Sequence, residues 1–112
     1  MTNLWIGVGR LTRDPELRYA SSGRAVAPMR LAVPRAGEDG ADFFDVVAFG
    51  TLGEACAEHL AKGRRILVEG TLRRSTWNDA EGAARSKVEI IANRVQFLDS
   101  PRREAAAGEP AA

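Results

Sequence analysis

The segment spanning residues 42–63 changes its hydrophobic period from that of a strand to that of a helix. Its first part, DFFDVVAF, alternates with a period of two, which is the side-chain period of a β-strand. One face of this strand carries Phe43 and Phe49, and the other face carries Phe44 and Val46. A half-exposed strand usually shows polar residues on its outer face, so two aromatic faces are unusual. Two interpretations follow: the strand is buried on both sides, or one face offers flat apolar rings to a ligand.

The second part of the segment has the pattern of a short helix. Thr51 and Glu54 form a capping box, in which the hydroxyl and the carboxylate each accept a hydrogen bond from a free backbone N–H. Apolar residues then recur at helical spacing between Leu52 and Leu60. Gly63 supplies the left-handed residue at which many helices end. The segment therefore predicts a strand that runs directly into a helix of about three turns.

Four other segments have the apolar pattern of strands: residues 4–8, 25–33, 65–72 and 86–98. Pro28 lies inside one of them and indicates an edge, a bulge or a strand end, because proline cannot donate to a ladder. The polar stretch 73–84 contains Asn-Asp and Glu-Gly pairs, which are typical of hairpin turns. The alternation slips at Ile90 and Ile91, which indicates a β-bulge.

The chain is thus predicted to contain three strands, one helix and two strands. A helix between the third and fourth of five strands is what an OB barrel requires, whereas a β-sandwich needs more strands and no helix. We predict an all-β protein with one short helix, folded as a five-stranded OB barrel over residues 1–98. Residues 99–112 offer almost no packing side chains, so we expect a short disordered tail there.

The composition argues against an enzyme. The chain of 112 residues has one His and one Cys, and it contains no cluster with metal-ligand spacing. We therefore expect no catalytic residues, no metal and no cofactor. A single cysteine leaves no disulfide within the chain, and no apolar run reaches the length of a membrane span. With no signal-peptide pattern either, we expect a cytoplasmic protein without a membrane partner. The net charge of +1 identifies no partner by itself.

Several motifs, in the same order along the chain, resemble bacterial single-stranded DNA-binding proteins. Residues 9–19, GRLTRDPELRY, are similar to the family's G-x-L-x-x-D-P-E-x-R-Y opening. Residues 43–50, FFDVVAFG, are similar to its W-x-x-V-x-x-F-G strand. LAKG at 60–63 and VEGTL at 68–72 match its L-x-K-G…V-E-G-x-L segment, and Trp77 matches the tryptophan that follows. The resemblance covers residues 3–98. It implies an OB fold, a homotetramer, and binding of single-stranded DNA without sequence preference.

The resemblance also implies a set of DNA-binding residues. Phe43, Phe49 and Trp77 would stack on bases, and such stacking is worth about 1–3 kcal/mol per base whatever the sequence. Lys62 matches a DNA-contacting lysine of the family. The other expected contacts are basic residues on or near the hairpin of Trp77, with one more in the loop where the family has a further tryptophan: Arg73, Arg74, Arg85, Lys87 and Arg35. We assign Trp5 to packing or to a subunit interface, and Tyr19 to either a structural or a DNA-contacting role.

The implied function is binding and protection of single-stranded DNA in replication, recombination or repair, in the cytoplasm at the nucleoid. Three departures matter. Phe43 stands where the family usually has tryptophan, and residues 33–36 contain no ring where the family has a further tryptophan. Residues 101–112 contain neither an acidic run nor a phenylalanine. The family recruits replication enzymes through such a tip, so we expect no tail-mediated recruitment and an accessory paralogue or a mobile-element copy. The alternative is an OB-fold accessory module, primosome-like or with an RNA or protein partner.

Overall fold

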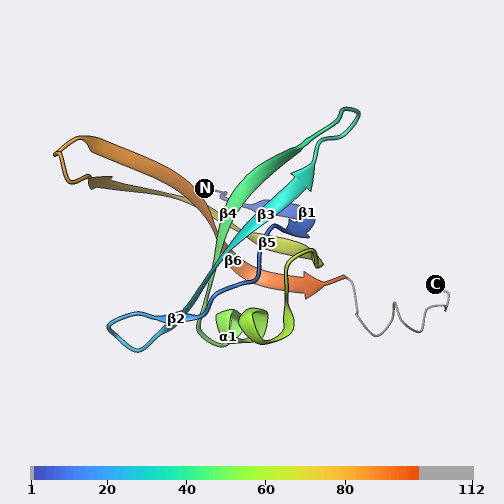
Figure 1. The fold of residues 1–112 in the computed structure, drawn as a ribbon, viewed down its shortest axis with the longest axis horizontal. Coiled ribbons are helices and arrows are strands. Elements are labelled where there is room, and N and C mark those ends of the chain that lie inside the picture. The colour runs from blue at the N-terminus through green and yellow to red at the C-terminus, as the bar shows by residue number, and fades with distance from the viewer. Residues whose placement is uncertain (1, 99–112) are drawn as a thin grey trace.

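The computed structural model describes residues 2–98, which form six strands and one helix (Figure 1). In chain order these are β1 (Trp5–Leu11), β2 (Arg18–Tyr19), β3 (Ala25–Pro34), β4 (Ala41–Phe49), α1 (Gly50–His59), β5 (Arg65–Asn78) and β6 (Ala84–Phe97). The predicted tail at 99–112 lies outside the described residues.

The strands close into a barrel. The sheet order is β1-β5-β6-β4-β3-β2, and an additional pairing of β1 with β3 joins the two ends of the five long strands. The β4–β6 pair is parallel, and the other pairs are antiparallel. The five-stranded OB barrel is confirmed, with β2 as a two-residue addition. The helix follows β4, which is the third strand of the barrel itself.

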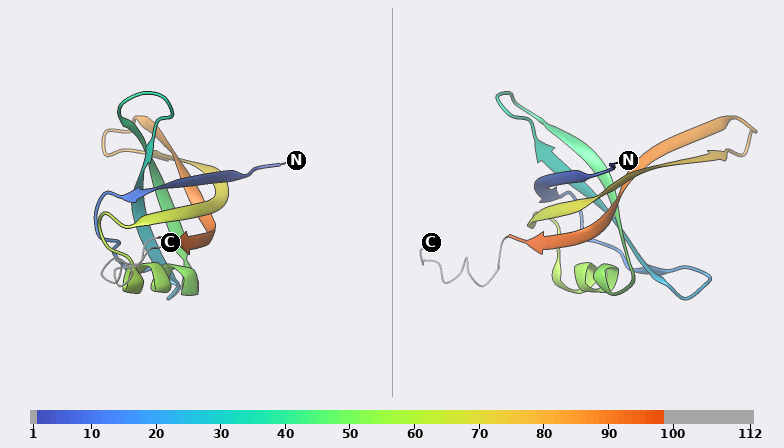
Figure 2. Two further views of the ribbon diagram at one scale, coloured as in Figure 1. Left: turned by 90° about the vertical axis from the view of Figure 1, so that its right-hand side faces the viewer. Right: turned by 180° about the vertical axis from the view of Figure 1, so that it is seen from behind.

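Alternation places one face of each strand in the core. The largest fully buried side chains are Leu31, Ile66, Ile90, Val46, Val68 and Cys56. α1 contributes Cys56 to this cluster, Leu60 follows at its C-cap, and the helix lies across one end of the barrel (Figure 2). Trp5 is partly buried against the core, with its ring 5.1 Å from that of Phe44, so its packing role is confirmed. Each large apolar side chain removed from water stabilises the barrel by about 1.5–3 kcal/mol.

The capping box and the glycine stop are wrong. α1 begins at Gly50, with Phe49 as its N-cap residue and no side-chain cap. Gly50 has φ +64°, and this left-handed residue turns β4 directly into the helix, so that Thr51 is already inside the first turn. The helix ends at His59. Gly63 has φ +88° but lies in the following turn, which leads into β5.

The hairpin of β5 and β6 is longer than the sequence pattern indicated. Residues 73–84 are mostly strand, because β5 continues to Asn78 and β6 starts at Ala84, and the predicted turn occupies the residues between them. The bulge lies at Asn93 and not at Ile90–Ile91, since Glu69 pairs with Arg94 and Gly70 with Ala92. Two hairpin arms, β3–β4 and β5–β6, project from the barrel on the side away from α1 (Figure 1).

Pro28 occupies an edge position, as predicted. β2 pairs with β3 as far as Val26, and β1 pairs with it from Leu31 onward. Pro28 lies between these two pairings on one side of β3, where a missing N–H interrupts no ladder.

Candidate nucleic-acid interface

The outer surface of four neighbouring strands forms one continuous face, which we call the platform. On β4 the core residues Val46 and Ala48 alternate with residues that point outward. Residues paired across neighbouring strands point to the same side of a sheet. The outward face therefore continues from Pro28 on β3 to Val47 on β4, then to Ile91 on β6 and Thr71 on β5. The platform residues used below are Arg30 on β3, Phe43, Asp45 and Phe49 on β4, Lys87 and Arg85 on β6, and Arg73 and Trp77 on β5.

The three aromatic residues predicted to stack on bases all belong to this platform. Phe43 is 54% exposed and Trp77 is 48% exposed, while Phe49 is half-buried near the start of α1. Phe43 and Phe49 are at opposite ends of the same strand, and Trp77 is near the tip of the β5–β6 arm, opposite Arg85. Exposed rings on a sheet surface are suited to stacking against flat apolar ligands.

Two arginines that the sequence analysis did not select lie over the β4 rings. The guanidinium carbon of Arg24 is 4.4 Å from the centre of the Phe49 ring. That of Arg30 is 5.2 Å from the centre of the Phe43 ring. The outward direction of Arg30 follows from its alternation with the buried Met29 and Leu31, so the strand pattern could have found it. Its ring partner depends on strand pairing.

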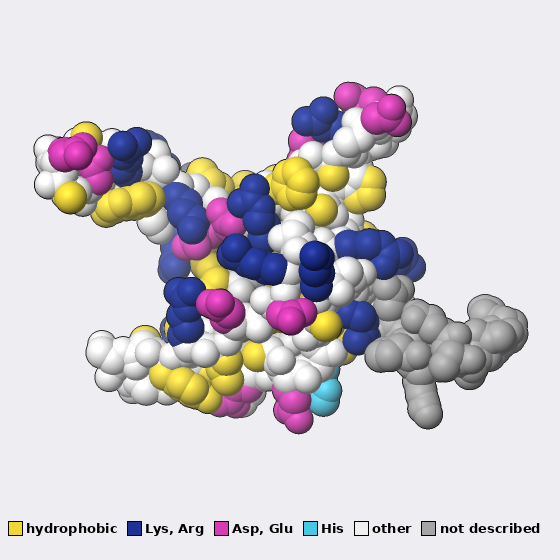
Figure 3. Space-filling model, viewed as in Figure 1, with side chains coloured by type: hydrophobic (Ala, Val, Ile, Leu, Met, Phe, Trp, Pro, Cys, Tyr) yellow, Lys and Arg dark blue, Asp and Glu magenta, His cyan; other side chains and the backbone are white. Residues whose placement is uncertain are grey.

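A carboxylate occupies the middle of the platform. Asp45 lies 3.7 Å from the Arg30 guanidinium and 3.8 Å from the Lys87 ammonium. Lys87 also lies 3.7 Å from Glu89. The positive charge of this region is therefore partly neutralised in the free protein. Figure 3 shows Lys and Arg side chains, with some acidic ones between them, across the middle of the face seen in Figure 1.

The remaining hairpin cations have different surroundings. Arg73 is on the platform, opposite Glu89 in the β5–β6 register, whereas Arg74 is on the other face, opposite Val88. Neither has a carboxylate partner among residues 2–98. Arg85 is 2.9 Å from Asp79 in the turn. This hydrogen bond, together with that from the Ala83 amide, holds the pKa of Asp79 below its usual value.

Arg35 and Lys62 are not brought together with the hairpin residues. Arg35 is in the loop of the β3–β4 arm, where its Nε donates to the Asp42 carboxylate at 3.0 Å. Lys62 is in the turn between α1 and β5, and its backbone N–H donates to Asp14 at 2.8 Å. Arg35 and Lys62 would therefore contact a bound nucleic-acid strand only if that strand extends beyond the platform.

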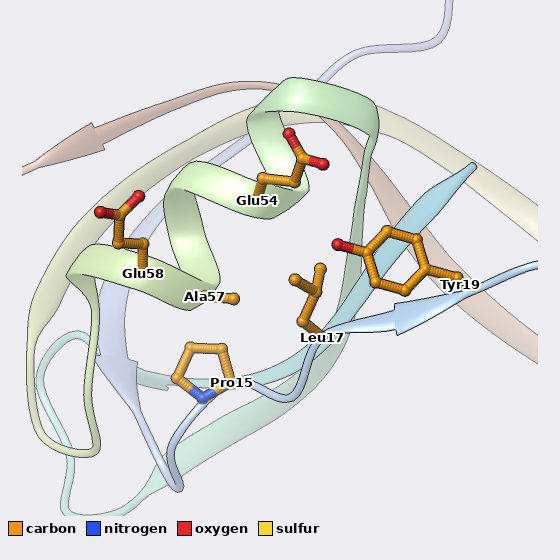
Figure 4. A pocket seen from close by; sticks show the side chains of 6 residues that line it. All are labelled: Pro15, Leu17, Tyr19, Glu54, Ala57 and Glu58. Atoms are coloured by element: carbon orange, nitrogen blue, oxygen red, sulfur yellow. The ribbon is translucent and has the colours of Figure 1, made fainter. Parts of the chain in front are cut away.

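Tyr19 faces a different surface. It lines an open groove of about 510 Å³ between α1 and the segment that leads into β2 (Figure 4). Glu54 and Glu58, one helical turn apart, project from α1 on the other side of this groove. Two carboxylates repel phosphate, so the groove is a poor surface for a nucleic-acid backbone.

No group of three or more His, Cys, Asp and Glu side chains within residues 2–98 could hold a metal. Burial raises the pKa of the Cys56 thiol to about 11, so that it stays protonated in the core. In the same part of the chain no helix is long and apolar enough to cross a membrane.

A closed five-stranded barrel with rings and cations on one outer sheet face has the architecture of an oligonucleotide-binding domain. Residues 1–98 match the family model described as the single-strand binding protein family, and the chain belongs to this family.

Similar proteins extend the match over most of the chain. A single-stranded DNA-binding protein of Treponema pallidum is 46% identical over 91% of this chain and 61% of its own length. One of Thermotoga maritima is 42% identical over 87% of this chain and 74% of its own length. Single-stranded DNA-binding protein 2 of Listeria innocua is 40% identical over 94% of this chain and 69% of its own length. The chain therefore spans between three fifths and three quarters of these relatives.

Proposed function

We propose that this protein binds single-stranded DNA without reading its sequence, and protects it during replication, recombination or repair. The observation that supports this most directly is the platform. Phe43, Phe49 and Trp77 come from two strands far apart in the chain, yet they share one outer face with cations. A protein that acts by such binding needs no catalytic group.

Both halves of a nucleotide find a complement on the platform. Bases stack on the exposed rings, which accept any base because every base has a π-face. Phosphates pair with Arg73 and Lys87, which lie between the rings of β4 and that of the hairpin. Duplex DNA keeps its bases stacked on each other, so it cannot use the rings and binds only through charge.

The protein is further proposed to be a homotetramer that works at the nucleoid in the cytoplasm. Large apolar side chains remain exposed on both faces of the sheet near β1 and the hairpin. Leu4 and Ile6, just before and on β1, are 58% and 55% exposed, and Leu72 and Val88, on the inner side of the hairpin, are 43% and 56% exposed. Leu72 and Val88 line one pocket together with Trp5 and Phe44, and an exposed apolar surface of this kind favours association between copies of a chain. Sedimentation at micromolar concentration tests this, and a monomer would contradict it.

Titration of intrinsic tryptophan fluorescence tests the binding function. The chain has two tryptophans, and replacing Trp5 with Phe leaves Trp77 as the single reporter on the platform. We expect strong, salt-sensitive quenching by oligo-dT and little by duplex DNA of equal length. Stronger quenching by oligo-rU would favour the RNA-binding alternative, and no quenching by any of the three would contradict the proposal.

We also propose that residues 101–112 recruit no replication enzyme. They carry two arginines and two glutamates and no aromatic side chain, so they offer a basic pocket neither an acidic run nor a ring. Deleting this segment should leave affinity for oligo-dT nearly unchanged. Capture of a replication or repair enzyme that depends on the segment would contradict this.

A further inference from the structure

Each of the two platform rings on β4, Phe43 and Phe49, lies beneath the guanidinium of a different arginine. The ring-centre distances are 4.4 Å for Arg24 over Phe49 and 5.2 Å for Arg30 over Phe43. Within about 6 Å, the negative face of an aromatic ring attracts a cation, and a guanidinium can lie flat against the ring. A base that approaches the covered face of either ring therefore meets the arginine first.

The two arginines are held in place by different means. Arg30 is tethered to Asp45, which lies 3.7 Å away as its partner on the neighbouring strand, two residues along β4 from Phe43 and on the same face. Arg24 immediately precedes β3, whose Val26 is paired with Phe49. No carboxylate within residues 2–98 pairs with Arg24, so the Phe49 ring is the contact that the structure gives its guanidinium.

We propose that Arg24 and Arg30 are base-stacking residues of the single-stranded DNA interface, each with its phenylalanine as the supporting layer. This inference rests on the proposed function. A guanidinium is planar and weakly hydrated, so one side can lie on the phenyl ring while the other stacks on a base. It also keeps its positive charge close to the phosphate of the stacked nucleotide.

This arrangement enlarges a small ring. A phenylalanine alone offers less stacking area than a tryptophan, whereas a phenylalanine under a guanidinium offers a second plane that carries charge. The competing possibility is that the arginine swings away and a base stacks directly on the phenyl ring. The two differ in what a lysine would do, because an ammonium supplies the charge but not the plane.

Conservative replacement separates these possibilities. We would measure binding of oligo-dT at several salt concentrations by the Arg24→Lys and Arg30→Lys variants, each checked for an unchanged melting temperature. Arg94→Lys is the matched control. Like Arg30, Arg94 is a strand arginine paired with a carboxylate, 3.1 Å from Glu69 on the neighbouring strand, and no ring lies under it among residues 2–98. We expect each platform variant to lose about three- to tenfold in affinity with an unchanged salt slope. The control should bind as the parent does.

The outcomes also separate this inference from the function on which it rests. Parent-like affinity in both platform variants, with the parent still binding oligo-dT, would overturn the inference and leave the function intact. A weaker salt slope with the same loss would also overturn it, because charge alone would then be the cause. A parent chain that does not bind oligo-dT would instead refute the proposed function.

Discussion

Removing the carboxylate from the middle of the platform should strengthen binding of single-stranded DNA. Asp45 lies between Arg30 and Lys87, at 3.7 Å and 3.8 Å, and a phosphate that pairs with either cation must approach it as well. The replacement Asp45→Asn keeps the size of the side chain and leaves a neutral oxygen near Arg30. It removes one negative charge from the platform, the proposed DNA-binding face.

The size of the gain follows from the geometry. A phosphate in contact with Arg30 or Lys87 would be roughly 7–8 Å from the Asp45 carboxylate. At that separation the repulsion between unit charges is about 0.5 kcal/mol in water and about 1 kcal/mol at half its dielectric constant. Affinity should therefore rise about two- to fivefold. Both ion pairs are partly exposed, so the free energy of unfolding should change by less than about 1 kcal/mol.

Salt dependence gives a second readout. Each cation freed to make a further phosphate contact should steepen the slope of log K against log salt by about 0.7 for a single strand. The assay is quenching of Trp77 fluorescence by oligo-dT at three or more salt concentrations.

Glu58→Gln is the matched control. It removes the same charge from α1, which lies outside the platform, and should leave both affinity and slope nearly unchanged. Equal gains in the two variants would show that only net charge matters. Unchanged binding by Asp45→Asn would show that DNA does not contact the centre of the platform around Asp45.

Trp77→Ala should weaken oligo-dT binding by about 1–3 kcal/mol without lowering the melting temperature. If the variant instead has a lower melting temperature and its folded fraction binds oligo-dT as the parent does, Trp77 has a structural role. Gly70→Ala should destabilise the barrel by at least about 1–3 kcal/mol in urea unfolding, because its Cβ would lie 2.1 Å from the Ile91 carbonyl oxygen; parent-like stability would show that the strands can part there. The lowered pKa of Asp79, due first to the Arg85 hydrogen bond, means that its contribution to the hairpin turn is present above the ordinary carboxyl pKa and is lost as pH falls through the lowered value. An NMR titration from about pH 6 to pH 2 should show the turn amides changing with a midpoint below about 3.8, and a midpoint at or above that value would contradict the coupling.

Much of the candidate site could be predicted, because the direction of each side chain depends on the local period of its strand. The alternation in residues 43–49 determines which β4 residues face the core and leaves Phe43 and Phe49 on the opposite face. The polar hairpin around Trp77 likewise indicates an exposed ring without knowledge of its neighbours. The start of the helix was not predictable. A capping-box pattern at Thr51 does not reveal that Gly50, with its left-handed φ, already begins the helix one residue before Thr51.

What the sequence by itself determined is therefore the set of elements and the face on which each side chain lies. The tertiary structure alone decided which faces became one surface. The parallel pairing of β4 with β6 joins the Phe43 face to the Trp77 hairpin, and the β3–β4 register sets Arg30 beside Asp45 and over the Phe43 ring. The physical reason is that a strand's period sets the direction of its side chains, whereas its partner and register are chosen by contacts between segments distant in the chain.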